Sequence, residues 1–100
     1  MIRHVTAAAI AAALLPAGAS AQNTGPTGQA LVQTCYVCHG PDGKSEGPIP
    51  PLAGLPEDHI ARQMADFKAD RLPGTIMNRI AKSYTDEQIA AIAQFIATLK

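Results

Sequence analysis

Residues 35–39 have the sequence Cys-Tyr-Val-Cys-His, and this run constrains the fold more than any other feature of the chain. A C-x-x-C-H run is typical of covalent haem attachment. Two thiols on adjacent turns of a helix lie on one face, so each can add to one vinyl group along an edge of a porphyrin. The histidine that follows is then held beside the iron. The run therefore predicts one covalently bound haem c, attached through Cys35 and Cys38, with His39 as an iron ligand.

Three other uses of this run stay open at the level of sequence. Cys35 and Cys38 could form a structural disulfide, a thioredoxin-like redox pair, or part of a zinc site with His39 and His59. No βαβ pattern surrounds the run, which disfavours the redox pair. The adjacent residues Cys38 and His39 are poorly placed as two corners of one zinc tetrahedron. Haem attachment is therefore favoured over all three.

Composition gives an independent reason to expect a large cofactor. The chain has 100 residues, with two Tyr, two Phe and no Trp. A domain this small with so few aromatic side chains is near the lower limit for a self-sufficient core. A haem would supply the missing apolar bulk.

The charge balance disfavours one class of partner. Eight Lys and Arg match eight Asp and Glu, so the formal net charge is zero. Binding to nucleic acid depends on clustered basic side chains that neutralise phosphates. We therefore expect no nucleic-acid partner.

The first 21 residues have the layout of a secretory signal peptide. A basic start is followed by an apolar stretch over residues 5–15 and a small-residue ending at Ala19-Ser20-Ala21. This predicts export to the periplasm with cleavage after about Ala21, which leaves residues 22–100 as one domain. The apolar stretch is shorter than the roughly 20 residues that span a bilayer. A retained membrane anchor is thus the less favoured alternative, and no permanent anchor is expected.

The mature part of the chain predicts an all-α fold of three to five short helices around the haem. No stretch alternates apolar and polar residues with the period of a strand. Helices are expected over residues 27–37, 57–69 and from 86 onward, with a further short turn or helix over residues 76–83. Thr85 and Gln88 fit a capping box at the start of the last helix. Apolar residues at helical spacing predict two buried faces, formed by Ile60, Met64 and Phe67, and by Ile89, Ile92, Ala93 and Ile96.

A long irregular segment separates the first two of these helices. Residues 40–56 contain four Gly and five Pro, which exclude a helix and make a strand improbable. Loops of this length in a small domain are usually functional or wrapped around something. Within the loop, the carbonyl of Pro50 is the expected acceptor for the second ring nitrogen of His39, since iron-bound histidines usually donate that N–H.

The second axial ligand of the iron is expected to be Met77. This residue follows the Pro-Gly pair at 73–74, in an expected loop between helices from which a thioether can approach the iron. Met64 and His59 are the alternatives, but Met64 lies on an expected core face and His59 in the first turn of a helix. A His/Met pair raises the haem potential relative to two histidines. For a haem propionate the preferred partner is Arg71, with Arg79 and Tyr84 as the other candidates.

Taken together, these residues resemble the class I cytochromes c. Residues 35–40 match the haem-binding motif of that family, Pro50-Pro51-Leu52-Ala53-Gly54 matches its P-x-L-x-G loop, and Met77 its axial-ligand position. Gly28 and Phe95 resemble the small and aromatic residues where the first and last helices cross. The resemblance implies the small class I cytochrome c fold and a protein that transfers single electrons without being an enzyme by itself.

Residues 66–87 are similar to a narrower group, the cytochrome subunit of flavocytochrome c sulfide dehydrogenase. In that group the haem subunit takes electrons from a flavoprotein that oxidises sulfide, so the resemblance implies a flavoprotein subunit as partner. The chain has one C-x-x-C-H run and so resembles the single-haem form, although Ser83 stands where the group often has Gly. The alternatives are a free soluble carrier between larger redox complexes and, from another class, a haem-free exported metal-binding or disulfide module.

Overall fold

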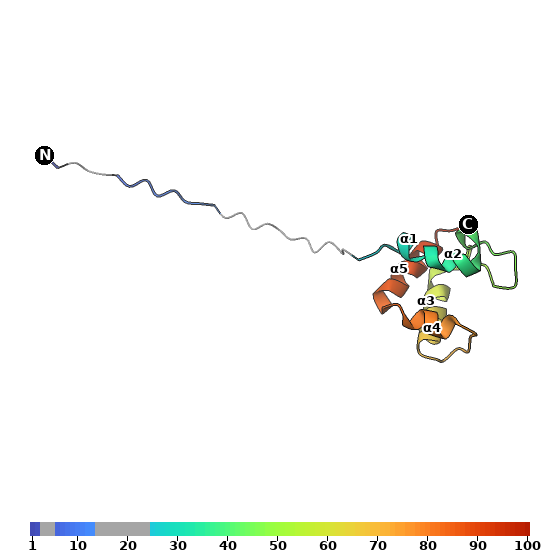
Figure 1. Ribbon diagram of the computed structural model, residues 1–100. Helices are drawn as coiled ribbons and strands as arrows, with labels where there is room; N and C mark the ends of the chain where they lie inside the picture. Colours follow the sequence, from blue (N-terminus) through green and yellow to red (C-terminus); the bar gives the residue numbers. More distant parts are fainter. Residues whose placement is uncertain (3–5, 14–24) are drawn as a thin grey trace.

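The computed structural model describes residues 1–2, 6–13 and 25–100. Within these ranges the regular structure is helical, without a strand, and Figure 1 shows the helices gathered into one body. The elements are α1 (Gly28–Leu31), α2 (Gln33–His39), the short 3-10 helix η1 (Pro41–Gly43), α3 (Glu57–Lys68), α4 (Met77–Lys82) and α5 (Asp86–Ile96). Helix α5 packs against α1 and α3, and α3 also packs against α4. The predicted all-α fold is confirmed.

The expected signal peptide falls largely outside the described residues. Its cleavage site after Ala21 lies in the undescribed range 14–24, and of its apolar stretch residues 6–13 are described and form no helix. In the described part of the chain, no helix has the length and apolar character needed to cross a membrane. The signal peptide and its cleavage site stay predictions.

The first predicted helix is longer than expected and divided into two. The Thr27 hydroxyl caps α1 by accepting from the Ala30 N–H at 3.2 Å. At Val32 the turn tightens, because the Cys35 N–H bonds to the carbonyl three residues back, at 2.9 Å. Helix α2 then continues through His39 and ends at Gly40, whose φ of 86° lies in the region that glycine adopts without a steric penalty. The whole C-x-x-C-H run is therefore helical.

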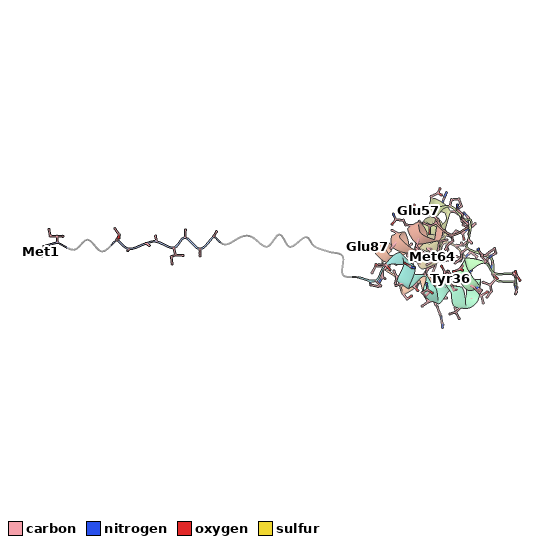
Figure 2. All side chains as sticks on the ribbon, turned by 90° about the horizontal axis from the view of Figure 1, so that it is seen from above. Met1, Tyr36, Glu57, Met64 and Glu87 are labelled. Carbon is pink, nitrogen blue, oxygen red and sulfur yellow. The ribbon has the colours of Figure 1, made fainter. Side chains whose placement is uncertain are left out.

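The core is small and comes mainly from α3 and α5. The stripe predicted on α5 is buried as expected, and Ile60 and Met64 are buried on α3, whereas Phe67 is only partly buried. In Figure 2 Met64 lies inside the helical body, while Glu57 and Glu87 lie at the first turns of α3 and α5. The buried hydrophobic residues are Val32, Ile60, Met64, Ala81, Ile89, Ile92, Ala93 and Ile96.

Two further features predicted for the last helix are present. The Thr85 hydroxyl accepts from the Gln88 N–H at 3.1 Å, and the Gln88 side chain accepts from the Thr85 N–H at 2.9 Å, which forms the capping box. Gly28 lies so close to α5 that a Cβ there would fall 2.2 Å from the Ala91 oxygen and 3.2 Å from the Phe95 Cβ. The predicted close crossing of the first and last helices at Gly28 and Phe95 is confirmed.

Candidate functional site

The motif on α2 carries two free cysteines. Cys35 is half-buried beside the core and Cys38 is exposed. Burial raises the pKa of the Cys35 thiol, and a hydrogen bond from Thr34 offsets this rise in part. The thiols are not joined, so the disulfide alternative is wrong for this structure. Two separate thiols at this spacing are the arrangement that attachment to two vinyl groups needs.

The zinc alternative also fails. Among residues 25–100 and the described part of the N-terminus, no three His, Cys, Asp or Glu side chains gather closely enough to hold a metal ion. His59 lies half-buried in the first turn of α3, apart from the motif on α2. The four residues that could have formed a tetrahedral site therefore do not form one.

His39 is oriented by the loop that follows it. Its Nδ1 lies 2.6 Å from the carbonyl oxygen of Pro50, which can only accept, so the nitrogen donates and the imidazole presents Nε2 as its free ligand atom. The loop is itself fixed, because the Gly43 carbonyl accepts from the Leu52 and Ala53 N–H groups at 2.8 and 3.0 Å. The acceptor expected at Pro50 is the atom that faces the ring.

The described part of the chain has two candidate methionines. Met64 is only 8% exposed and belongs to the core, as its position on α3 suggested. Met77 is half-buried and packs against the edge of the core. It is the first residue of α4 rather than part of the preceding loop, so its expected place in the loop is wrong by one residue. Met77 thus lies where a loop ends and a helix begins, with its sulfur outside the fully buried core.

Two of the three expected propionate partners make side-chain contacts of their own. Arg71 donates from Nε to Asp66 at 3.0 Å and remains exposed, which leaves its terminal nitrogens for other contacts. Arg79 is exposed on α4. The Tyr84 hydroxyl lies 3.0 Å from the Thr34 hydroxyl, next to Cys35, a link that sequence patterns could not reveal because the two residues are 50 positions apart. The preference for Arg71 stays a prediction.

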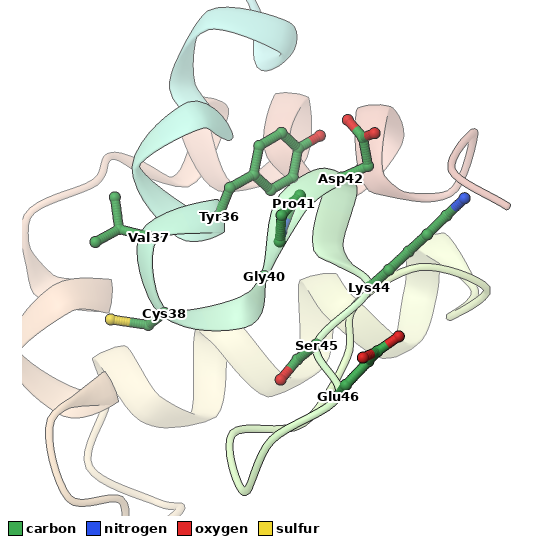
Figure 3. A pocket seen from close by; sticks show the side chains of 9 residues that line it. All are labelled: Tyr36, Val37, Cys38, Gly40, Pro41, Asp42, Lys44, Ser45 and Glu46. Carbon is green, nitrogen blue, oxygen red and sulfur yellow. The ribbon is translucent and has the colours of Figure 1, made fainter.

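A surface hollow of about 590 Å³ runs along α2 and the start of the next loop (Figure 3). Charged side chains at Asp42, Lys44 and Glu46 line it together with Tyr36 and Cys38. Cys38 lies across the hollow from Lys44, and its sulfur is directed away from it (Figure 3). Cys35 and His39 do not line it. Because a haem attached to the motif must meet all three of its side chains, we do not assign the haem to this hollow.

Comparison with known proteins supports the interpretation of the motif on α2 as a haem-binding site. Residues 26–100 match the family model of cytochrome c. The chain belongs to the cytochrome c family. Haem c is therefore its cofactor, and electron transfer is its activity. The residues present fit that group, since they supply two free thiols one turn apart on α2 and an imidazole held by a backbone carbonyl.

Two kinds of relative bear most on the role of this cytochrome. It is 35% identical to the cytochrome subunit of sulfide dehydrogenase of Chlorobaculum tepidum, over 91% of this chain and 94% of that one. It is 33% identical to cytochrome c4 of Azotobacter vinelandii, over 82% of this chain but only 44% of the relative. A solved cytochrome c4 from Acidithiobacillus ferrooxidans superposes with a TM-score of 0.69 and 31% identity, over 78% of this chain and 54% of that one. The class I cytochrome c fold is thereby confirmed.

Proposed function

We propose that this cytochrome is the periplasmic haem subunit of a flavin-dependent sulfide dehydrogenase. In this role it accepts single electrons from the flavoprotein and passes them to another redox protein. The proposal is supported by the likeness to the Chlorobaculum tepidum subunit, which spans nearly the whole of both chains. The cytochromes c4 match over a large part of this chain but extend well beyond it.

Different residues of the chain are proposed to attach the haem and to bind its iron. Cys35 and Cys38 would bind the haem covalently, and His39 and Met77 would ligate its iron. Bound haem supplies reversible one-electron exchange at its iron. A histidine and a methionine together favour a higher potential than two histidines, which suits an acceptor of electrons.

One observation carries the assignment of His39. Its Nδ1 donates to the Pro50 carbonyl at 2.6 Å, a bond that fixes the ring tautomer and leaves Nε2 as the atom available to iron. Such a bond to a backbone carbonyl is the usual device for orienting a metal-bound histidine. The acceptor lies in the proline-rich loop between α2 and α3.

A visible absorption spectrum of the protein, purified gently from its native source, tests the proposed partner. A reduced c-type haem spectrum with flavin absorbance at constant stoichiometry supports the sulfide dehydrogenase subunit. The same spectrum without flavin in any fraction, together with no co-elution with added flavoprotein, contradicts it. That second outcome favours a free soluble carrier, the role that the likeness to the cytochromes c4 supports.

The periplasmic location is tested on the same material. If the signal peptide is cleaved as expected, amino-terminal sequencing of the mature protein begins at or near Gln22. A chain that begins at Met1 in the membrane fraction contradicts both cleavage and the absence of a permanent anchor.

A further inference from the structure

One side chain fastens the loop that leads to Met77. Residues 69–76 connect α3 to α4, and Asn78 follows Met77 directly. The Asn78 Oδ1 accepts from the Gly74 N–H at 2.9 Å. Its Nδ2 donates to the Leu72 carbonyl at 2.8 Å and to the Phe67 carbonyl at 3.2 Å, with the Asp70 carboxylate at 3.3 Å. A single amide thus joins the end of α3, the loop and the start of α4.

The second half of this loop has few other ties. Backbone hydrogen bonds to Asp66 hold Arg71 and Leu72, at 2.8 and 3.2 Å. Among the described residues, the backbone from 73 to 75 is held by the bond from the Gly74 N–H to Asn78. The loop also lies tightly on α3, because a Cβ at Gly74 would fall 2.8 Å from the ring of Phe67. Without Asn78, the segment just before Met77 would lose its hydrogen-bonded anchor.

The chemistry of the contact requires an amide. Only Asn and Gln carry both an acceptor oxygen and two N–H donors at one side-chain end. Here the oxygen faces a backbone N–H and the nitrogen faces two backbone carbonyls. A carboxylate would retain the first contact and lose the donors. An alanine would lose every one of these contacts.

We propose that Asn78 is a positioning residue that holds Met77 at the iron. The inference rests on the proposed function, in which Met77 is the second axial ligand. Met77 is half-buried at the junction between loop and helix, so the position of its sulfur follows the end of the loop. Release of the loop raises the population in which the sulfur has left the iron, and an external ligand then binds in its place with higher apparent affinity.

The test is an imidazole titration of the haem-loaded ferric protein, followed by loss of the far-red absorption that a sulfur–iron bond produces. Asn78→Ala is expected to bind imidazole at least about tenfold more tightly than the parent protein. Asn78→Asp keeps the acceptor for Gly74 but sets a carboxylate oxygen against the Leu72 carbonyl and the Asp70 carboxylate, so it is also expected to bind imidazole more tightly than the parent. It also carries the test if the alanine variant does not fold.

Thr85→Ala is the matched control, because it removes the cap of α5 without touching the loop. It is expected to lower the melting temperature and leave the imidazole affinity within about twofold of the parent, since the population of the released loop is unchanged. An equal rise in affinity in Thr85→Ala and Asn78→Ala would overturn the proposal, because it would show a general loss of stability.

Met77→Ala separates this inference from the function on which it rests. If Met77→Ala abolishes the far-red sulfur absorption while both Asn78 variants keep the parent's imidazole affinity, the positioning role is wrong and the ligand assignment stands. If Met77→Ala retains that absorption, the ligand is another residue, and the assignment of Met77 and the role of Asn78 fall together.

Discussion

Two glycines in the loop between α2 and α3 differ in what they can accommodate. Gly43 has a φ of 69°, and a Cβ there would lie 3.2 Å from the Leu52 Cβ. Its carbonyl also holds the segment that carries Pro50, through the Leu52 and Ala53 N–H groups. At Gly47, four residues on, φ is not positive and a Cβ would have no neighbouring atom within 4 Å. Substitution of these two glycines therefore distinguishes the effect of backbone strain at Gly43 from the general effect of replacing a loop glycine.

Gly43→Ala is expected to lower the free energy of unfolding by about 1–2 kcal/mol, the cost of a left-handed backbone for a residue with a Cβ. It should also weaken the orientation of His39, because the Pro50 carbonyl moves with the strained segment. Gly47→Ala is the control, expected to be neutral or to stabilise by up to about 1 kcal/mol through the unfolded chain. Chemical denaturation measures both, and equal stabilities of the two variants would contradict this account of the loop.

Asp70, just after the end of α3, forms an ion pair with Lys82 at the end of α4. Its carboxylate accepts from Lys82 Nζ at 2.5 Å and from Asn78 Nδ2 at 3.3 Å, and the bond to Lys82 holds the pKa of Asp70 below its usual range. A carboxylate with a lowered folded-state pKa stabilises the fold above its unfolded pKa, near 3.9. That contribution is lost as the pH falls through the folded value.

The expected signature of this pair is pH-dependent. At neutral pH, Asp70→Asn should melt at a lower temperature than the parent, while keeping the φ of 57° that asparagine tolerates. The difference between the two proteins should shrink as the pH falls below about 4, where the parent carboxylate also becomes neutral. Thermal unfolding at a series of pH values measures it. A difference that stays constant down to pH ~2 would assign the effect to something other than this charge.

At the scale of single elements, the crossing of α1 and α5 depends on the absence of a side chain. Gly28→Ala would place a Cβ 2.2 Å from the Ala91 oxygen, a backbone atom that cannot rotate away. The helix propensity of alanine favours the substitution by about 1 kcal/mol. Overpacking costs about 1–3 kcal/mol, so the net effect is expected to be destabilising.

Gln29→Ala on the same helix is the matched control for Gly28→Ala. Gln29 is exposed, so its truncation leaves the crossing intact and should change stability by less than about 0.5 kcal/mol. Both variants are compared with the parent by thermal unfolding. If the melting temperature of Gly28→Ala is equal to or higher than that of Gln29→Ala, the close approach of the two helices is not maintained in solution.

The elements differ in how far sequence could predict them. Helix α5 was predictable in full, because its capping box and its apolar stripe are both local patterns. The division between α1 and α2 at Val32 was not predictable, since a tightened turn inside a helix does not change the spacing of the apolar residues. The segment expected over residues 76–83 forms α4 but begins one residue later, at Met77, because Ile76 caps the helix without a side-chain hydrogen bond that the sequence could signal. Local signals thus define elements, and helix ends without a capping side chain escape them.

The candidate site shows the same limit at larger scale. The C-x-x-C-H run and the proline-rich loop are sequence motifs, and together they pointed to the contact between His39 and Pro50. The pairing of Thr34 with Tyr84 and of Arg71 with Asp66 depends on side chains brought together by folding. The role of Asn78 is hidden for the same reason, because its partners are mostly backbone atoms of other segments.

For the molecule as a whole, the core of buried side chains is small, so the bound haem is expected to contribute to the stability of the fold. Within the described residues, eight hydrophobic side chains are buried, and two of them are alanines. The chain contains no Trp and only two Phe and two Tyr, so few large side chains could fill the space of a porphyrin. A domain of this size usually needs a metal, a cofactor or a disulfide in addition to its own core.

The double variant Cys35→Ser with Cys38→Ser tests attachment and stability together. Haem absorption should be absent from its denatured chain, because no thioether can form, and helical circular dichroism and cooperative melting should be much reduced. The single variant Cys38→Ser keeps one thiol and is the control, expected to retain haem after denaturation and most of the helical signal. Haem that stays with the denatured double variant would disprove attachment through these cysteines. Cooperative melting of its haem-free chain would instead show that the eight buried side chains suffice for folding.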